Sequence, residues 1–167
     1  SQKAGRAVGE TTSEPCGASR QSDRLASTDA CDAVEFGETM NGMLYGVGLG
    51  PGDPELMTLK AARLIGKANV IAYPSLEGGD SFARAIAANV ISKGTEEIAI
   101  SIPMSVKRAP AQAAYDKGAA AIAAQLEVGK DVVVLCEGDP FFYGSFMYFF
   151  SRLSDRFECK IVPGVTS

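Results

Sequence analysis

Residues 132–140 read Val-Val-Val-Leu-Cys-Glu-Gly-Asp-Pro. Four consecutive large apolar residues, followed by polar and turn-forming residues, are typical of a strand that is covered on both faces. Such strands lie in the centre of parallel sheets, whose neighbouring strands are joined by long crossovers that usually contain a helix. The segment therefore predicts an α/β fold, with a polar loop at the carboxyl end of a central strand.

The sequence on either side alternates between strand and helix signals, as this prediction requires. Strands are expected at residues 43–47, 70–73, 97–102, 132–135 and 160–162, and helices over residues 56–67, 80–92, 110–127 and 146–153. Prolines end three of these strands, and Asp53 or Thr58 could cap the first helix. The long helix has an apolar stripe from Tyr115 to Leu126, and Gly129 follows it as a left-handed cap. We expect a five-stranded, mainly parallel sheet flanked by helices.

Residues 1–42 differ from the rest of the chain. They are rich in Ser, Thr, Gly, Asp and Glu and lack periodicity, so they cannot bury enough apolar surface to offset the entropy of the chain. We interpret them as a disordered or non-native extension, with Met43 as a natural initiator. Residues 43–167 then form the ordered domain. Because the sequence stops at a strand-to-helix turn, Pro163-Gly164-Val165-Thr166-Ser167, we expect a C-terminal domain to be absent from it.

The composition excludes several classes of function. The chain has no histidine, which rules out Ser-His-Asp and Cys-His catalysis within it and removes the commonest metal ligand. None of its four cysteines forms a C-x-x-C pair, so no metal site is predicted. The net charge of −4 argues against general nucleic-acid binding. Without a run of about 20 apolar residues or a signal-peptide pattern, we expect a cytoplasmic protein that does not bind membranes.

Ligands of open α/β sheets bind at the carboxyl ends of the strands, where three loops of this sequence are informative. The first, residues 46–53, reads Gly-Val-Gly-Leu-Gly-Pro-Gly-Asp. It is not a P-loop, because no lysine follows its glycines until Lys60. It is not a Rossmann fingerprint either, because Pro51 occupies the place of a required glycine. By itself this loop could equally be a structural turn.

The other two loops carry polar and aromatic candidates. In residues 137–145, Asp139 could bind a hydroxyl or an amine of a ligand, or only cap the following helix. Phe141 and Phe142 lie close to the loop and are candidates for ligand contact. In the last loop, Thr166 could contact a ligand or cap a helix. The three loops follow the first, fourth and fifth predicted strands, so one sheet would bring them to the same edge.

Three motifs in these loops together resemble the tetrapyrrole methylase family. They are Gly48-Leu49-Gly50-Pro51-Gly52-Asp53-Pro54-Glu55-Leu56-Met57-Thr58-Leu59, Gly138-Asp139-Pro140 and Val162-Pro163-Gly164-Val165-Thr166-Ser167. The resemblance covers residues 43–167. Within the family, residues 135–148 look like the branch that methylates precorrin-2 at carbon 20. The uroporphyrinogen III branch typically has glycine in place of Glu137 and a basic residue in place of Ser145.

The resemblance implies a two-domain enzyme, usually a homodimer, that binds S-adenosylmethionine between its domains. It would methylate a carbon of precorrin-2, or of the cobalt form, in cobalamin biosynthesis. The implied cofactor-binding residues are Pro51, Glu137, Gly138, Asp139, Phe142, Thr166 and Ser167. Gly50 and Pro51 are the implied substrate contacts. Because a sulfonium methyl group is already activated, no catalytic side chain is assigned and no metal is expected.

Other interpretations stay open. The substrate carries many carboxylates, which Lys107 and Arg108 could bind, although this basic pair could also be simply exposed and solvated. The chain could be another methylase of the family, acting on uroporphyrinogen III, a diphthine precursor or ribosomal RNA, and its acidic charge argues against RNA. It could also be a nucleotide-binding module without methyl transfer, against which Pro51 and the missing lysine argue.

Overall fold

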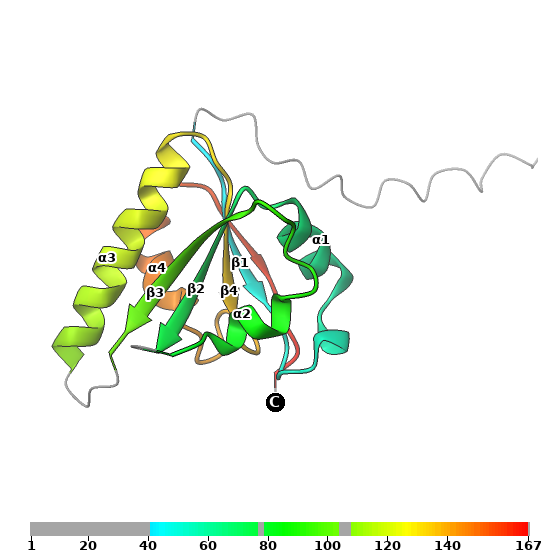
Figure 1. Cartoon of the computed structure of the whole chain (residues 1–167). Helices are drawn as coiled ribbons and strands as arrows, with labels where there is room; N and C mark the ends of the chain where they lie inside the picture. Colours follow the sequence, from blue (N-terminus) through cyan, green and yellow to red (C-terminus); the bar gives the residue numbers. More distant parts are fainter. Residues whose placement is uncertain (1–40, 77–78, 104–107, 167) are drawn as a thin grey trace, which may run out of the picture. The chain divides into compact units, whose positions relative to one another are not determined.

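The computed structural model describes residues 41–76, 79–103 and 108–166. The chain divides into two units, Ser1–Ala33 and Val34–Ser167, and all the described residues belong to the second. Figure 1 shows this unit as a twisted sheet between two groups of helices. The proposed extension, residues 1–42, lies almost entirely outside the described residues, as do Cys16 and Cys31.

The sheet contains five strands, all parallel in the described part of the chain. They are β1 (Leu44–Gly48), β2 (Val70–Leu76), β3 (Glu96–Ile102), β4 (Val132–Cys136) and β5 (Cys159–Val162), in the order β3-β2-β4-β1-β5. Every pair of neighbours is parallel, which confirms the predicted fold class. The strand that opened the sequence analysis, β4, is the middle one, between β2 and β1.

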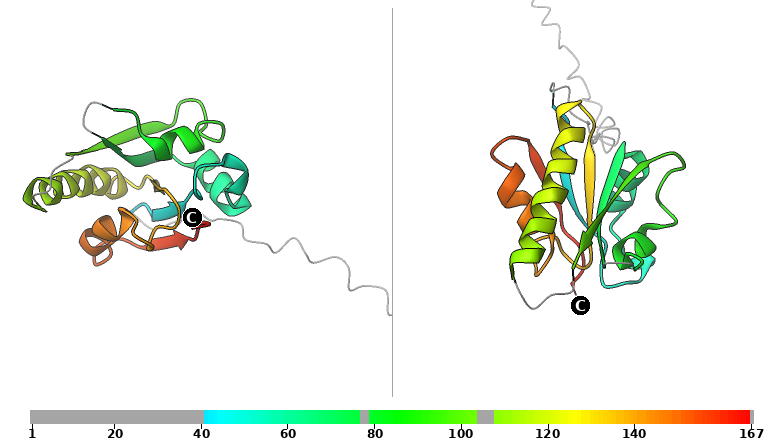
Figure 2. Two further views of the ribbon diagram at one scale, coloured as in Figure 1. Left: turned by 90° about the horizontal axis from the view of Figure 1, so that it is seen from below. Right: turned by 60° about the vertical axis from the view of Figure 1, so that its left-hand side comes forward.

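Two helices cover each face of the sheet (Figures 1 and 2). The helices α1 (Leu59–Lys67) and α2 (Phe82–Ala87) pack on one face, and α3 (Arg108–Glu127) and α4 (Phe146–Leu153) pack on the other. Side chains alternate along a strand, so Val132 and Val134 join the core under α3 and α4. Val133 and Leu135 join the core under α1 and α2. This double burial explains the uninterrupted apolar run of β4.

The second strand is longer than predicted, because it continues through Pro74 to Leu76. Its pairing with β4 stops at Ala72, so beyond that point β2 pairs only with β3. The Pro74 carbonyl accepts a hydrogen bond of 2.6 Å from the Ser81 hydroxyl instead of one from β3. The N–H and the carbonyl of a strand residue point to the same side, so the N–H that Pro74 lacks would have faced this open side. Proline is tolerated at such an edge.

The predicted first helix is two elements in the structure. A short 3₁₀ helix, η1 (Pro54–Leu56), is capped by Asp53, and α1 is capped separately by Thr58. Both capping candidates are therefore confirmed, each for its own helix. The predicted helix over residues 80–92 is also shorter, since α2 ends at Ala87. The long helix and its stripe are confirmed, and Gly129 follows it with the left-handed φ of 79°.

The loops after β1, β4 and β5 touch through backbone atoms at the carboxyl edge of the sheet. Gly50 and Gly138 form an antiparallel bridge, in which the Gly138 N–H donates to the Gly50 carbonyl at 2.9 Å. A Cβ atom at Gly48 would lie 2.5 Å from the Gly164 nitrogen and 2.6 Å from the Gly138 carbonyl oxygen. One at Gly164 would also collide with that oxygen. We call this contact of Gly48, Gly138 and Gly164 the glycine junction.

A buried carboxylate lies at the opposite, amino edge. Asp131 is 3% exposed and accepts a hydrogen bond of 2.7 Å from the Met43 N–H. Burial raises the pKa of Asp131, while the Met43 N–H and Lys160 act in the opposite direction. Burial also raises the pKa of nearby Tyr45 to about 12, with Asp131 and Glu158 contributing. The amino edge is thus packed around groups that favour their neutral forms.

The glycine junction predicts that Gly164→Ala destabilises the fold. The added methyl group would meet backbone atoms of Gly138 and Gly48, which cannot rotate away. We expect a loss of about 1–3 kcal/mol in the free energy of unfolding, measured by urea denaturation. The matched control is Gly66→Ala in α1, where a Cβ atom would lie 3.5 Å from the nearest atom. That substitution should stabilise the chain by about 0.5–1 kcal/mol through helix propensity. Equal effects of the two substitutions would contradict the steric argument.

The buried Asp131 predicts a pH-dependent stability. A raised pKa means that the folded chain holds the proton more tightly than the unfolded chain. Its contribution is therefore full below the unfolded pKa of about 4 and is lost as the pH rises through the folded pKa. Asp131→Asn should thus gain stability relative to the native chain as the pH rises from about 4 through the raised pKa of the folded state. Urea denaturation of both proteins across this range measures the difference, and a gap that does not change with pH would contradict the prediction.

Candidate functional site

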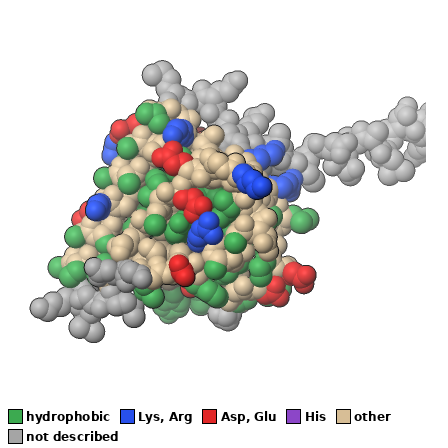
Figure 3. All heavy atoms as spheres, in the orientation of Figure 1, with side chains coloured by type: hydrophobic (Ala, Val, Ile, Leu, Met, Phe, Trp, Pro, Cys, Tyr) green, Lys and Arg blue, Asp and Glu red, His purple; other side chains and the backbone are tan. Residues whose placement is uncertain are grey.

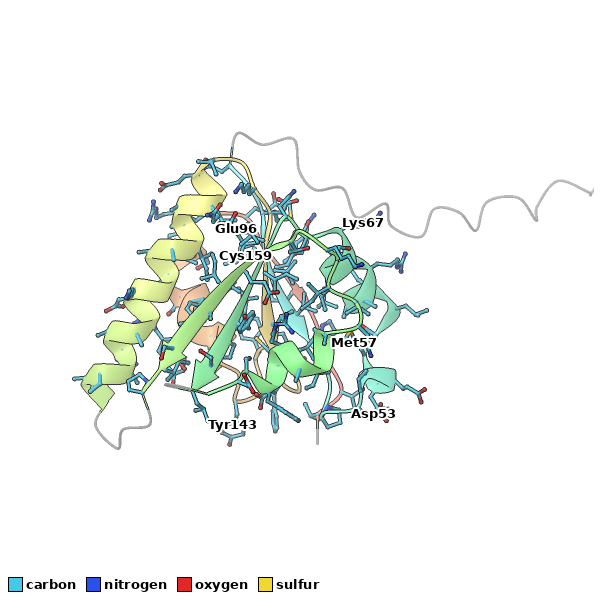
Figure 4. All side chains as sticks on the ribbon, in the orientation of Figure 1. Asp53, Met57, Lys67, Glu96, Tyr143 and Cys159 are labelled. Atoms are coloured by element: carbon cyan, nitrogen blue, oxygen red, sulfur yellow. The ribbon has the colours of Figure 1, made fainter. Side chains whose placement is uncertain are left out.

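The strand order opens a crevice at the carboxyl edge of the sheet. The strands β1 and β4 are neighbours in the sheet. After β1 the chain continues to α1 on one face, whereas after β4 it continues to α4 on the other face. Such a divergence is where open α/β sheets bind their ligands. Figure 4 shows Tyr143 and Asp53 at this edge, with Glu96 and Cys159 at the opposite one. The glycine junction forms the base of this region.

A first cavity of 330 Å³ lies over the glycine junction. Its lining residues are Pro51, Phe82, Glu137, Gly138, Asp139, Phe142, Tyr143 and Thr166. They come from the loops after β1, β4 and β5, together with the start of α2. Six of the seven residues that the sequence analysis assigned to cofactor binding meet here, although up to 115 positions separate them. The seventh, Ser167, lies outside the described residues.

Asp139 connects two of the loops. One carboxylate oxygen accepts the Phe141 N–H at 2.9 Å, and the other accepts the Gly164 N–H at 3.2 Å. The carboxylate does not cap α4, whose N-cap is Ser145. The capping alternative for Asp139 is therefore wrong. Both its oxygens bind backbone, so Asp139 shapes the first cavity by holding the loop after β5 against the loop after β4.

A second cavity of 420 Å³ continues along the same edge, towards β2 and β3. It is lined by Pro74, Ser75, Leu76, Asp80, Ser81, Phe82, Ile102, Tyr115, Cys136, Glu137, Tyr143, Gly144 and Ser145. Three residues line both cavities: Phe82, Glu137 and Tyr143. The two spaces therefore adjoin, and each is within the size range of small-molecule sites, about 300–1,000 Å³.

The charge of the two linings is negative. Asp80, Glu137 and Asp139 line them, and no lysine or arginine is found among their described lining residues. In Figure 3, acidic and hydrophobic side chains occupy the lower margin of the face, and the visible basic ones lie higher. The Cys136 thiol also lines the second cavity, but burial raises its pKa to about 12. It stays a neutral thiol near pH 7 and is no nucleophile.

The remaining candidates have other placements. Gly50 is buried and binds Gly138 through the backbone, without lining either described cavity. Phe141 packs edge-to-face on Phe146 and Phe150, with ring centroids 5.9 and 5.3 Å apart, but it is 42% exposed and lines neither of the two cavities. Lys107 lies outside the described residues, and Arg108 is the first residue of α3.

Sequence reasoning missed the residues that α2 and α3 contribute. Phe82 begins α2 and lines both cavities, and Tyr115 of α3 lines the second, where its hydroxyl lies 3.4 Å from the Ser145 hydroxyl. The sequence pattern predicts Tyr115 only as part of the apolar stripe of the long helix. The capping residue Ser81 could have indicated the role of Phe82. A helix that begins just after β2 places its first side chain, that of Phe82, near the carboxyl end of this strand.

Two absences in the described ranges, residues 41–76, 79–103 and 108–166, bear on function. No group of three or more His, Cys, Asp or Glu residues in those ranges could hold a metal ion. None of the helices described there is long and apolar enough to cross a membrane.

Comparison with known proteins places this geometry in a family. The profile of the tetrapyrrole (corrin/porphyrin) methylases matches residues 43–167. The chain is 46% identical over 134 residues to the cobalamin biosynthesis protein CobIJ of Mycobacterium tuberculosis, covering 75% of this chain and 26% of that protein. It is 39% identical over 134 residues to precorrin-2 C(20)-methyltransferase of a Sinorhizobium species, covering 75% of this chain and 55% of the relative.

Two solved structures are also similar. Cobalt precorrin-4 methyltransferase CbiF has a TM-score of 0.55 and 29% identity over 74% of this chain and 46% of its own. Uroporphyrin-III C-methyltransferase from Thermus thermophilus, complexed with S-adenosyl homocysteine, has a TM-score of 0.50 and 30% identity over 75% of this chain and 46% of its own. The chain spans about half the length of the Sinorhizobium relative and about a quarter of CobIJ. With a family profile that matches three quarters of its residues, the chain belongs to the tetrapyrrole methylase family.

Proposed function

We propose that this chain forms the donor-binding part of an S-adenosylmethionine-dependent methyltransferase that acts on a corrin precursor. One observation carries the proposal: six of the seven residues expected to contact the cofactor, from three separate loops, line a single cavity. The relatives named for methyl transfer to tetrapyrroles, one of them solved with S-adenosyl homocysteine, support it.

The chemistry of the lining fits this cofactor. S-adenosylmethionine carries a cationic sulfonium and an ammonium group, and the cavities have carboxylates but no described lysine or arginine. A triphosphate or a dinucleotide pyrophosphate would meet repulsion instead of the usual cationic or helix N-terminal contacts. The position of α1 also argues against a phosphate ligand. The short helix η1 separates the N-terminus of α1 from the glycine loop, so that N-terminus does not directly follow the loop.

The residues of the chain would act by placing the two reactants. S-adenosylmethionine would supply a methyl group already activated by its sulfonium. The glycine junction and Asp139 hold the loops in fixed relative positions, which limits where a bound donor can lie. Holding two reactants in line can lower a barrier by about 7–11 kcal/mol. That contribution needs no side chain that titrates near pH 7, in agreement with a chain without histidine.

For the acceptor we propose precorrin-2 or its cobalt form, methylated at carbon 20. The Sinorhizobium relative bears the name of this reaction. Glu137 and Ser145 also differ from the residues typical of the uroporphyrinogen III branch, and both line the second cavity. We further propose that a second domain, following residue 167, completes the cleft, and that the complete protein is a cytoplasmic homodimer.

A titration tests the donor site. S-adenosyl homocysteine is titrated calorimetrically into this chain and into a version continued beyond Ser167 by the proposed second domain. We expect both to bind, with an affinity at least about tenfold higher for the continued version, because two surfaces then enclose the ligand. NAD serves as the control ligand and should not bind. Binding of NAD in preference to S-adenosyl homocysteine would support a nucleotide-binding module and contradict the proposal.

A charge reversal tests the acceptor. The described linings of the two cavities offer no cation for a polycarboxylate, so our candidates are Lys107, which directly precedes α3, and Arg108, the first residue of α3. In the continued protein, Lys107→Glu with Arg108→Glu should raise the KM for the acceptor about tenfold and leave the KM for the donor unchanged. Lys117→Glu, an exposed position further along α3, is the control. An unchanged acceptor KM in the double variant would remove the pair from the site.

A further inference from the structure

Two aromatic residues from different elements line the region where the cavities adjoin. Phe82 is the first residue of α2, and Tyr143 lies in the loop between β4 and α4. Each of these two residues lines the first and the second cavity, and among the described lining residues only Glu137 does the same. Although they are aromatic, Phe82 is 55% exposed and Tyr143 is 92% exposed. Exposed rings around a cavity indicate that something covers them in the working molecule.

The backbone of Tyr143 is strained. Its φ of 54° makes it the one residue other than glycine with a positive φ in the described ranges. Bulky residues rarely adopt this conformation, and such strain concentrates at ligand sites. Packing does not account for it, since the ring is almost fully exposed and its one ring contact with another described residue is edge-to-face with Phe142, at 5.0 Å between centroids. A ligand contact would explain why a tyrosine occupies a position suited to glycine or asparagine.

Phe82 is held in place by its neighbours. Ser81 caps α2 by accepting the Arg84 N–H and fixes the helix to β2 by donating to the Pro74 carbonyl at 2.6 Å. On the other side, the Phe82 ring lies close to Gly52, where a Cβ atom would come within 3.1 Å of it. The ring is therefore a fixed wall at the junction of the two cavities.

We propose that Phe82 and Tyr143 contact a flat conjugated ring system bound across the junction of the two cavities. Aromatic faces and edges favour such a partner over a flexible or aliphatic one. The inference rests on the proposed function, in which two flat groups are available: the adenine of the donor and the macrocycle of the acceptor. The experiment distinguishes them by using a separate probe for each.

The test uses the continued protein and two probes. S-adenosyl homocysteine is titrated by calorimetry, and uroporphyrin III, a flat tetrapyrrole, by its absorption band. Tyr143→Asn removes the ring but keeps a residue that tolerates positive φ, so its free energy of unfolding should equal or exceed that of the native protein. Tyr143→Phe keeps the ring. Phe82→Leu keeps an apolar side chain at the other wall, and Val128→Asn, a 68% exposed residue at the far edge, is the matched control.

We expect Tyr143→Asn and Phe82→Leu to weaken one probe about tenfold, with Tyr143→Phe and Val128→Asn binding as the native protein does. Weaker binding of S-adenosyl homocysteine identifies the adenine as the flat group, and weaker binding of uroporphyrin III identifies the macrocycle. Native affinity of Tyr143→Asn and Phe82→Leu for both probes overturns this inference and leaves the proposed function intact. A native protein that binds neither probe overturns both.

Discussion

The candidate site depends on the approach of three backbone segments to within contact distance. The loops after β1, β4 and β5 meet at Gly48, Gly138 and Gly164, where a Cβ atom on Gly48 or Gly164 would collide with a facing main chain. Asp139 adds a hydrogen bond from one loop to another, and the Gly50–Gly138 bridge adds a third link. Because these contacts are made by main-chain atoms, the loops have little freedom to move apart or to slide.

That constraint determines where ligands can bind. Backbone atoms fill the glycine junction, and the two cavities are lined by the residues around it and by residues of β2 and β3. Side chains from the loop tips then set the chemistry of the walls. The carboxylates of Asp80 and Glu137 and the rings of Phe82 and Tyr143 make these walls acidic and aromatic. Donor binding and acceptor selection would therefore depend on the side chains of the loop tips. Neither ligand would need to change the conformation of the glycine junction.

Much of this arrangement could be predicted from the sequence. The apolar run of β4 predicted a central parallel strand, because a strand buried on both faces needs apolar residues at every position. The glycine, Gly-Asp-Pro and Pro-Gly motifs each follow a predicted strand, so their loops were expected at the same edge of the sheet. The helix expected from residue 80 does begin there, at Phe82, but the place of this ring in both cavities was missed, because it depends on how α2 packs beside the loops after β1 and β4. The passage of β2 through Pro74 was missed because it depends on where β4 stops pairing, which no local signal records.

The separation of a main-chain base from side-chain walls has an evolutionary consequence. Substitutions at Glu137, Phe142 or Ser145 would alter what the crevice accepts without disturbing how its loops are joined. A substitution at Gly164 would affect every ligand at once, whatever its identity. Lineages built on this domain could thus diversify at the walls, whereas substitutions at the base would be selected against. Changes of substrate could then accumulate one residue at a time, each intermediate still folding.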